Sequence, residues 1–219
     1  MPQEQTLQQQ IRCISHEIRN QLSICDVYAE ILKKHLEKEN IKNASIDNSI
    51  KCIQQAIKLI GNNLIDLKSF DNIVPHIIDS DKLINACIEL CHVYIQDKKI
   101  KINSETENNI RIFADENKLQ GCIINIIKNA IESIDKVGFI KITSQKDDKK
   151  LVIKISNNGV PISPEAKGTI FDEGFTTKKT GSGIGLYLCK KNLNAMNSDI
   201  ELTKSDKSET EFTITVPIA

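Results

Sequence analysis

The chain has 219 residues, which is enough for one large domain or two small ones with a buried core. Lysine plus arginine equal aspartate plus glutamate at 29 each, so the overall charge indicates neither a nucleic-acid partner nor binding to an anionic membrane surface. No apolar run approaches the roughly 20 residues that span a bilayer, and the first residues lack the pattern of a signal peptide. The sequence therefore predicts a soluble, cytoplasmic protein without membrane insertion.

Residues from about 5 to 70 have a helical pattern with one charged break at 37–40. Before the break, apolar residues at spacings of three and four share one helical stripe, formed by Ile11, Ile14, Ile18, Leu22, Cys25, Ala29, Leu32 and Leu36. After it, a coiled-coil-like seam is formed by Ile46, Ile50, Ile53, Ile57, Ile60, Leu64 and Leu67. Two such helices joined by a short turn form an antiparallel hairpin. One hairpin buries both stripes poorly, so we expect two copies to form a four-helix bundle and the chain to be a homodimer.

A second domain is predicted beyond the helical region, because Pro75 disfavours a helical conformation in the residue before it. Helices are predicted at 80–96, 115–134 and 184–196. Strands are predicted at 99–102, 110–114, 139–143, 151–155, 200–202 and 212–216. This alternation predicts an α/β sandwich, with helices packed on one face of a mixed sheet. The predicted domains are residues 1–73 and 74–219.

The seven cysteines include no Cys-x-x-Cys pair, and an odd number without a secretion signal argues against a disulfide framework. Cys87, Cys91 and His92 could in principle be three metal ligands on one helix. Most of the cysteines stand among apolar residues, however, and are expected to be small buried hydrophobic side chains.

His16 lies about 200° around the first helix from Ile14, so it points away from the apolar stripe. An isolated outward-facing histidine is most often simply solvated. Here Glu17 is adjacent and Asn20 follows one helical turn later, within reach of the imidazole. A neutral imidazole has a nucleophilic nitrogen, so this cluster is a candidate reactive site.

The segment His16-Glu17-Ile18-Arg19-Asn20-Gln21-Leu22 resembles the phosphoacceptor box of sensor histidine kinases, usually H-E-[IL]-[RK]-[NT]-P-L. The resemblance implies that His16 is phosphorylated and that Glu17 polarises its ring. It also implies that Asn20 positions water when the kinase dephosphorylates its partner. Gln21 replaces the family's proline, which indicates a straighter helix and removes no reacting group.

Asn125 and Asn129 are four residues apart and share one face of the helix predicted at 115–134. Two carboxamides can bind a hard cation through oxygen, although two asparagines alone are more often solvated. The stretch from Ala114 to Ala130 resembles the N box of the ATPase domain of these kinases, which implies that both asparagines hold Mg²⁺ against the phosphates of ATP. Glu132 stands where many relatives have a basic residue, so one phosphate contact is expected to be absent.

The segment Asn157-Asn158-Gly159-Val160-Pro161-Ile162 by itself indicates a surface turn. It occupies the place of the family's D-x-G-x-G box, whose aspartate accepts a hydrogen bond from the amino group of adenine. The resemblance implies that Asn157 and Gly159 belong to a degenerate adenine-binding loop. In that loop Asn157 replaces the aspartate and Pro161 replaces the second glycine.

The segment from Ile170 to Lys178 resembles the F box and the start of the ATP lid of the same family. The resemblance implies ATP contacts for this segment, through Phe171, Phe175, Thr177 and Lys178. The two phenylalanines are expected to anchor a loop, and the lysine can reach a phosphate.

The segment Gly181-Ser182-Gly183-Ile184-Gly185-Leu186 then opens a helix. Glycines let the backbone approach phosphates closely, and a helix N-terminus favours anions. No Rossmann strand and turn precede these glycines, and the acidic residue expected roughly 20 positions later is missing, so a dinucleotide fold is not expected. The resemblance implies that Gly181, Gly183, Gly185 and Leu186 bind ATP.

Five motifs in this order resemble the transmitter core of a sensor histidine kinase, with its helical hairpin followed by a Bergerat-type ATPase domain. The implied function is autophosphorylation of His16 from Mg-ATP and transfer of the phosphoryl group to an aspartate of a response-regulator receiver domain, with phosphatase activity as a second role. The alternative is a catalytically weak or dead dimeric scaffold that binds a response regulator, which Asn157 and Pro161 favour. ATPases and serine kinases with the same nucleotide fold lack the hairpin with His16.

Overall fold

The chain divides into two compact units, Met1–Asp71 and Asn72–Ala219, in the computed structural model. The structure describes residues 18, 21–22, 24–39, 41, 43, 45–47, 49–50, 53–54, 56–57, 60, 73–95, 97–178 and 183–219.

The described residues of the first unit form two helical segments. Those between 18 and 38 are helical, and so are those between 45 and 60. Asn43 begins the second segment, because its Oδ1 accepts the backbone N–H groups of Ser45 and Ile46 at 3.0 and 3.3 Å. Gln54 Nε2 donates to Glu30 Oε2 at 3.4 Å and so joins the two segments. The two predicted helices are thus found in the described part of this unit, and their pairing with a second copy stays a prediction.

The second unit alternates helices and strands, as the sequence predicts. Its first half contains β1 (His76–Asp79), α3 (Ser80–Cys91), the short 3₁₀ helix η1 (His92–Tyr94), β2 (Lys99–Thr106), β3 (Arg111–Ala114) and α4 (Glu116–Ser133). Its second half contains β4 (Val137–Asp147), β5 (Lys150–Asn157), α5 (Gly185–Asn194), β6 (Asp199–Ser205) and β7 (Thr210–Pro217).

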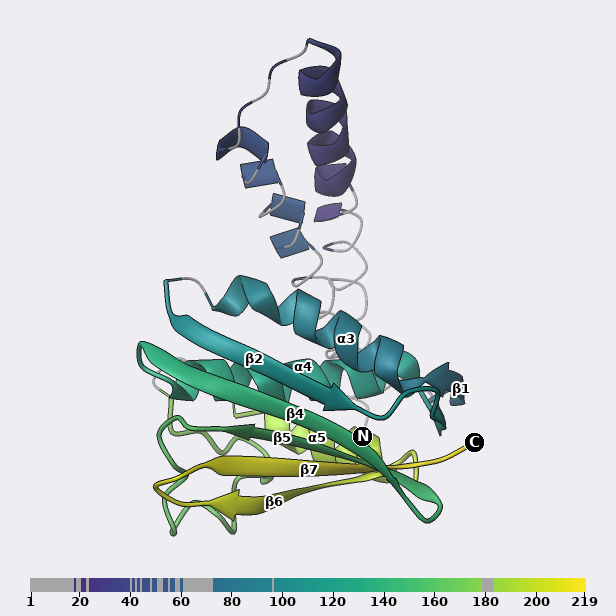
Figure 1. Ribbon diagram of the computed structural model, residues 1–219, viewed down its shortest axis with the longest axis vertical. Coiled ribbons are helices and arrows are strands. Elements are labelled where there is room, and N and C mark those ends of the chain that lie inside the picture. Colours follow the sequence, from purple (N-terminus) through teal and green to yellow (C-terminus); the bar gives the residue numbers. More distant parts are fainter. Residues whose placement is uncertain are drawn as a thin grey trace, which may run out of the picture. The chain divides into compact units, whose positions relative to one another are not determined.

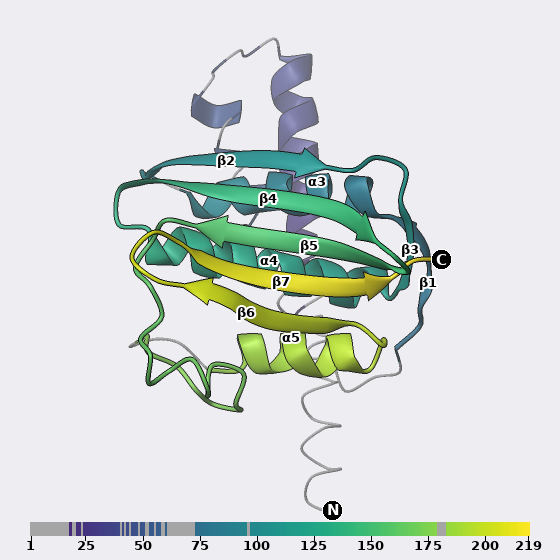
Figure 2. The same cartoon turned by 60° about the horizontal axis from the view of Figure 1, so that its bottom comes forward.

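One five-stranded sheet dominates this unit, with the strand order β2-β4-β5-β7-β6 (Figure 1). The β2–β4 pair is parallel and the other pairs are antiparallel, so the sheet is mixed. The helices α3, α4 and α5 lie on one face of it (Figure 2). A small antiparallel sheet, β1–β3, stands beside it. The predicted α/β sandwich with helices on one face of a mixed sheet is confirmed.

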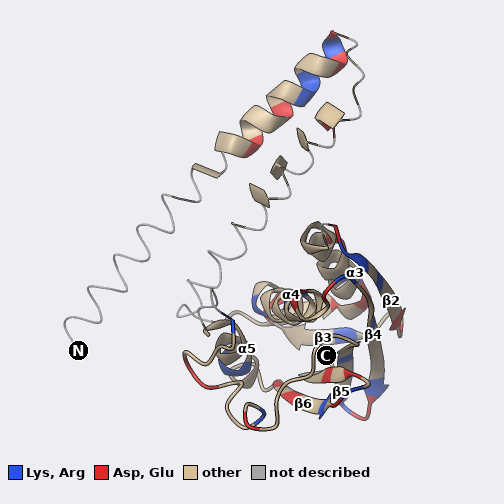
Figure 3. Ribbon diagram, turned by 90° about the vertical axis from the view of Figure 1, so that its left-hand side faces the viewer, with Lys and Arg blue, Asp and Glu red and all other residues tan. Residues whose placement is uncertain are grey.

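The core lies between the sheet and the helices. Alternate residues of the central strands point to the helices and are fully buried, including Ile140, Ile142, Ile153, Ile155 and Ile214. The opposite face of the sheet has no helix over it in the described part of the chain. Charged residues of both signs occur on the strands (Figure 3). Lys141 pairs with Glu105 there, and Lys154 with Glu211.

The helix α4 is held at both ends by side chains. At its start Asp115 is the N-cap: its Oδ1 accepts the N–H of Lys118 at 3.1 Å, and its Oδ2 accepts the N–H of Val74 at 3.0 Å. At its end Lys98 Nζ donates to the carbonyl oxygens of Ile131 and Ile134 at 2.8 and 2.6 Å. These contacts fix the helix that carries the N box.

Several predicted boundaries need correction. The helix expected at 80–96 ends at Cys91 and continues only as η1. The strands expected at 139–143 and 151–155 are longer, because hydrogen bonds of the β4–β5 hairpin extend to the exposed pair Asp147 and Lys150. The strand β1 was missed, since its four residues give too short a pattern for periodicity and depend on pairing with β3.

The described cysteines of the second unit are buried side chains. Cys87, Cys91, Cys122 and Cys189 are buried, whereas Cys25 of the first unit is exposed. Burial raises the pKa of Cys91 to about 12, so its thiol stays protonated. Within the described ranges, no group of three or more His, Cys, Asp or Glu side chains could hold a metal ion, which disfavours the alternative of a Cys87, Cys91 and His92 site. None of the helices in the described part of the chain has the length and apolarity that crossing a bilayer requires.

Candidate functional site

One face of α4 carries the polar side chains of the site. Spacings of four, three and one residues along the helix place four polar side chains on this face: Asn125, Asn129, Glu132 and Ser133. Their neighbours Ile123, Ile126 and Ile127 point into the core and are buried. The apolar side of α4 therefore fixes the position of the polar side.

Lys178 reaches α4 from the loop after β5. Its Nζ donates to Asn129 Oδ1 at 2.6 Å and also contacts Glu132 Oε2. Because an ammonium group only donates, the contact orients the amide oxygen of Asn129, and not its NH₂ group, toward the lysine. The structure thus brings together two predicted site residues that are 49 positions apart, with Glu132 as a third partner.

Asn125 lies against the first turn of α5. A Cβ atom on Gly185 would stand 2.8 Å from both Nδ2 and Oδ1 of Asn125, so any larger residue at this position would have to displace the amide group of Asn125. Asn125 Nδ2 also donates to Cys189 Sγ at 3.4 Å. Leu186 is partly buried against the core and anchors the helix start. Ile184 is the N-cap of α5, and the N-terminus of a helix favours an anion.

Two glycine backbones close the base of the loop that carries Lys178. Gly174 N donates to Gly183 O at 3.2 Å. Both residues have positive φ angles, 80° and 69°, and a Cβ on Gly183 would stand 2.3 Å from the carbonyl carbon of Gly174. Only glycine fits at Gly183 without displacing the backbone.

The aromatic residues of the F box attach this loop to the core. Phe171 packs edge-to-face on Phe212 with ring centroids 6.4 Å apart, and Lys190 Nζ stands 5.5 Å from the Phe171 ring centroid. Phe175 is partly buried against the same core. Thr177 is exposed and directly precedes Lys178. The anchored loop thereby brings Lys178 to α4.

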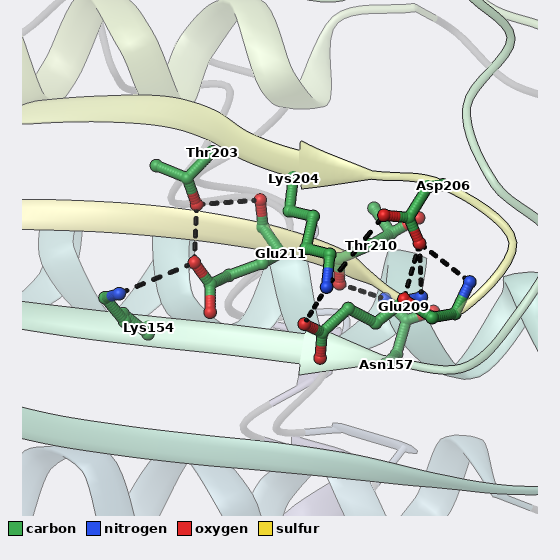
Figure 4. Close-up of polar contacts among 9 residues, drawn as sticks. Lys154, Asn157, Thr203, Lys204, Asp206, Glu209, Thr210 and Glu211 are labelled. Carbon is green, nitrogen blue, oxygen red and sulfur yellow. Dashed lines mark hydrogen bonds and ion pairs between the residues drawn. The ribbon is translucent and has the colours of Figure 1, made fainter.

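Asn157 ends β5 and is only 3% exposed. Its Oδ1 accepts the N–H of Gly159 at 3.0 Å and lies 3.0 Å from Ser133 Oγ, whose one proton is shared between this oxygen and the carbonyl of Ala130 at 2.8 Å. Its Nδ2 donates to the carbonyl of Thr210 at 3.3 Å, and Figure 4 shows both residues at this end of the sheet. One lone pair of the amide oxygen is therefore in use and Ser133 competes for the other, while Nδ2 has a second N–H beyond the one that Thr210 accepts.

Ser133 and Thr210 were not identified from the sequence. Ser133 stands one turn after Asn129 on the polar face of α4, and that spacing is a signal that could have found it. A Cβ on Gly159 would stand 2.1 Å from Ser133 Oγ, so the two residues pack directly together. Thr210 faces Asn157 only through the register of β5 and β7, which the sequence does not show.

Four predicted site residues lie outside the described part of the chain. They are the phosphoacceptor His16, its neighbours Glu17 and Asn20, and Gly181 of the glycine segment.

The comparisons with known proteins agree on one family. Residues 114–219 match the family described as histidine kinase-, DNA gyrase B- and HSP90-like ATPase. The chain is 28% identical to sporulation kinase D of Bacillus subtilis, over 94% of this chain and 40% of that protein. It is 30% identical to the signal transduction histidine-protein kinase AtoS of Escherichia coli, over 97% of this chain and 35% of that protein. The chain thus spans less than half the length of these relatives.

Two solved structures have similar folds. The catalytic domain of the histidine kinase ThkA superposes with a TM-score of 0.61 at 30% identity, covering 66% of this chain and 95% of that domain. Full-length ShkA in complex with AMPPNP gives a TM-score of 0.65 at 21% identity, covering 96% of this chain and 46% of that protein, a likeness of fold alone.

Proposed function

Because this chain belongs to the sensor histidine kinases and contains their ATPase domain, we propose that it binds Mg-ATP and transfers the γ-phosphoryl group to His16. The phosphoryl group then passes to an aspartate of a response-regulator receiver domain, with both units in the cytoplasm, where ATP is available. Use of ATP by a kinase-type domain is a property of the family, and the remaining steps are the proposal.

The observation that carries the proposal is the meeting of Lys178 with Asn129 on α4. Lys178 and the N-terminus of α5, with Gly183, Gly185 and Leu186, would hold the phosphates. Asn125 and Asn129 would hold Mg²⁺, whose charge neutralises the phosphate oxygens during transfer. Asn157 and Gly159 would contact the base, and Phe171 and Phe175 anchor the loop that carries Lys178.

The transfer requires positioning and charge neutralisation more than covalent help from the protein. A neutral ring nitrogen of His16 attacks the γ-phosphorus, the N–P bond forms, and the bond between phosphorus and the departing ADP oxygen breaks. Glu17 orients the ring and accepts its other N–H. Asn20 positions water for dephosphorylation of the regulator.

Homodimerisation through the first unit is supported by its exposed apolar side chains. Large apolar residues that are 45 to 58% exposed in the single chain include Ile24, Val27, Ile31, Leu32, Ile53 and Ile60. Burying such a side chain contributes about 1.5–3 kcal/mol, so a second copy would stabilise the hairpin. Light scattering at micromolar concentration is expected to give the mass of a dimer, and a monomer would contradict the proposal.

A catalytically weak or dead scaffold that binds a response regulator is the second candidate. The observation that favours it is the amide oxygen of Asn157, which accepts the N–H of Gly159 and has Ser133 Oγ at 3.0 Å, so two protein donors compete with adenine for it. The scaffold keeps the fold and the dimer but transfers no phosphate.

Labelled ATP separates the two candidates. The parent is expected to incorporate label that is lost in acid, since phosphohistidine is acid-labile. His16→Gln should abolish labelling and still bind nucleotide, while the control variants His35→Gln and His92→Gln should label normally. Retained labelling in His16→Gln would overturn the assignment of the phosphoacceptor, and absence of labelling in the parent would favour the scaffold.

A further inference from the structure

Lys178 occupies a point between two oxygen ligands on α4. Its Nζ lies 2.6 Å from Asn129 Oδ1 and also contacts Glu132 Oε2. Both oxygens are therefore turned toward a positive charge. The side chains of Lys178 and Glu132 remain 46% and 38% exposed, so an ion from solvent can reach the same point.

The two oxygens are of the kinds that hard divalent cations prefer. Mg²⁺ and similar ions bind carboxylate and amide oxygens and keep several water ligands, so two protein ligands are enough for a weak site. Asn129 and Glu132 are three residues apart on α4, so the helix holds their side chains on one face. The arrangement is built without help from a nucleotide.

The charge of Glu132 also bears on nucleotide binding. A carboxylate beside phosphates places like charges close together, unless a cation lies between them. Lys178 supplies that charge in this structure, but an ammonium held by Glu132 and Asn129 is not available to a phosphate. A divalent cation in its place would both satisfy Glu132 and release Lys178.

We propose, on the basis of the function given above, that Glu132 is a cation-binding residue of the ATP site and that Lys178 competes with the divalent cation for Asn129 Oδ1 and Glu132 Oε2. Cation binding then comes before the contact between Lys178 and phosphate. The carboxylate of Glu132 makes binding of the nucleotide phosphates more dependent on the metal.

The test measures Mn²⁺ binding to the full chain without nucleotide, by the electron paramagnetic resonance signal of free Mn²⁺. Lys178→Met removes the competitor and should tighten Mn²⁺ binding by about two- to five-fold, the range expected for an exposed ion pair. Glu132→Gln removes a charged ligand and should weaken it by about tenfold or more. The variant with both Lys178→Met and Glu132→Gln should bind Mn²⁺ with about the same affinity as Glu132→Gln alone.

Two matched controls remove the same charges elsewhere. Glu173→Gln changes an exposed residue in the same loop as Lys178. Lys128→Met changes a lysine of α4 whose Nζ lies 5.2 Å from the ring centroid of Tyr94. Both should leave Mn²⁺ affinity as in the parent.

Unchanged or weaker Mn²⁺ binding in Lys178→Met would overturn the proposal, as would no effect of Glu132→Gln. No measurable binding to Lys178→Met at millimolar Mn²⁺ would also overturn it. Calorimetry with an unhydrolysable ATP analogue tests the proposed function separately. If the analogue binds and Mn²⁺ affinity does not respond to these variants, only the inference about Glu132 fails; if the parent does not bind the analogue at all, the kinase proposal fails.

Discussion

The substitution Asn157→Asp should lower the stability of the ATPase domain and raise its affinity for adenine nucleotide. Asn157 is buried, and its NH₂ group donates to the carbonyl of Thr210. A carboxylate turns an oxygen toward that carbonyl, so one hydrogen bond is lost and the carbonyl of Thr210 loses a donor. The loss is about 1–3 kcal/mol, while stronger hydrogen bonds from Ser133 and Gly159 to a charged acceptor offset part of it. We expect the free energy of unfolding to fall by about 1–2 kcal/mol at neutral pH.

The difference in free energy of unfolding between the parent and Asn157→Asp should become smaller as the pH falls. The carboxyl is buried and faces a carbonyl oxygen, which disfavours its charged form and raises its pKa above the value in the unfolded chain. Protonation restores a donor to Thr210, so the stability of Asn157→Asp should recover below that raised pKa.

The same change should strengthen nucleotide binding. In the parent the amide oxygen already accepts the N–H of Gly159 and lies within hydrogen-bond distance of Ser133 Oγ, so the amino group of adenine competes with both for it. Hydrogen bonds to charged groups contribute about 1.5–3 kcal/mol and neutral ones about 0.5–1.5, so the carboxylate should improve affinity by about 1 kcal/mol, near a factor of five. Because the parent presents an N–H, its preference for adenine over guanine should be weaker than that of Asn157→Asp.

Urea unfolding and calorimetry with an unhydrolysable ATP analogue measure the two effects. Asn158→Asp is the matched control, since the Oδ1 of Asn158 only accepts from the N–H of Phe139, at 2.8 Å, and a carboxylate keeps that bond. The reasoning is refuted if Asn157→Asp is as stable as the parent and binds the analogue no better. No binding by either protein at millimolar analogue would favour the scaffold.

Three further predictions concern single contacts. Lys98→Met should lower the free energy of unfolding by about 1–3 kcal/mol, because two carbonyl groups at the end of α4 lose their partly buried donor; urea unfolding measures this, and no change would contradict it. Gly183→Ala should weaken binding of the ATP analogue by displacing the base of the loop, while Gly168→Ala, with open space at its Cβ, should not; equal binding by both variants would contradict this. The hydroxyl of Ser208, and after it the backbone N–H of the same residue, donate to Asp206 and lower its pKa to about 2. The contribution of Asp206 to the free energy of unfolding is therefore present above pH 4 and is lost as the pH falls toward 2. A titration midpoint near 4 by NMR would refute this.

The fold could be predicted where one segment alone determines its structure. The helix expected at 115–134 is found at 116–133, because its apolar stripe and the cap at Asp115 both lie within the segment. The ends of β4 and β5 could not be predicted in the same way. Their outer residues are polar and exposed, and they are strands only because the hairpin pairs them.

The candidate site shows the same division. Asn129 and Lys178 were selected by their motifs, but the contact between them depends on a loop that Phe171 and two glycine backbones hold in place. The partners of Asn157 depend on sheet register, which single-sequence patterns do not contain. The assignment of His16 stays a prediction from its motif.

The N-cap of α4 has a mechanical consequence. The carboxylate of Asp115 binds the first turn of α4 through one oxygen and the N–H of Val74 through the other. A force that displaces the chain at Val74 must therefore break this hydrogen bond or move the first turn of the helix. As long as that hydrogen bond holds, a displacement at Val74 moves the first turn of α4, the helix that also carries Asn125 and Asn129, the residues proposed to hold the metal.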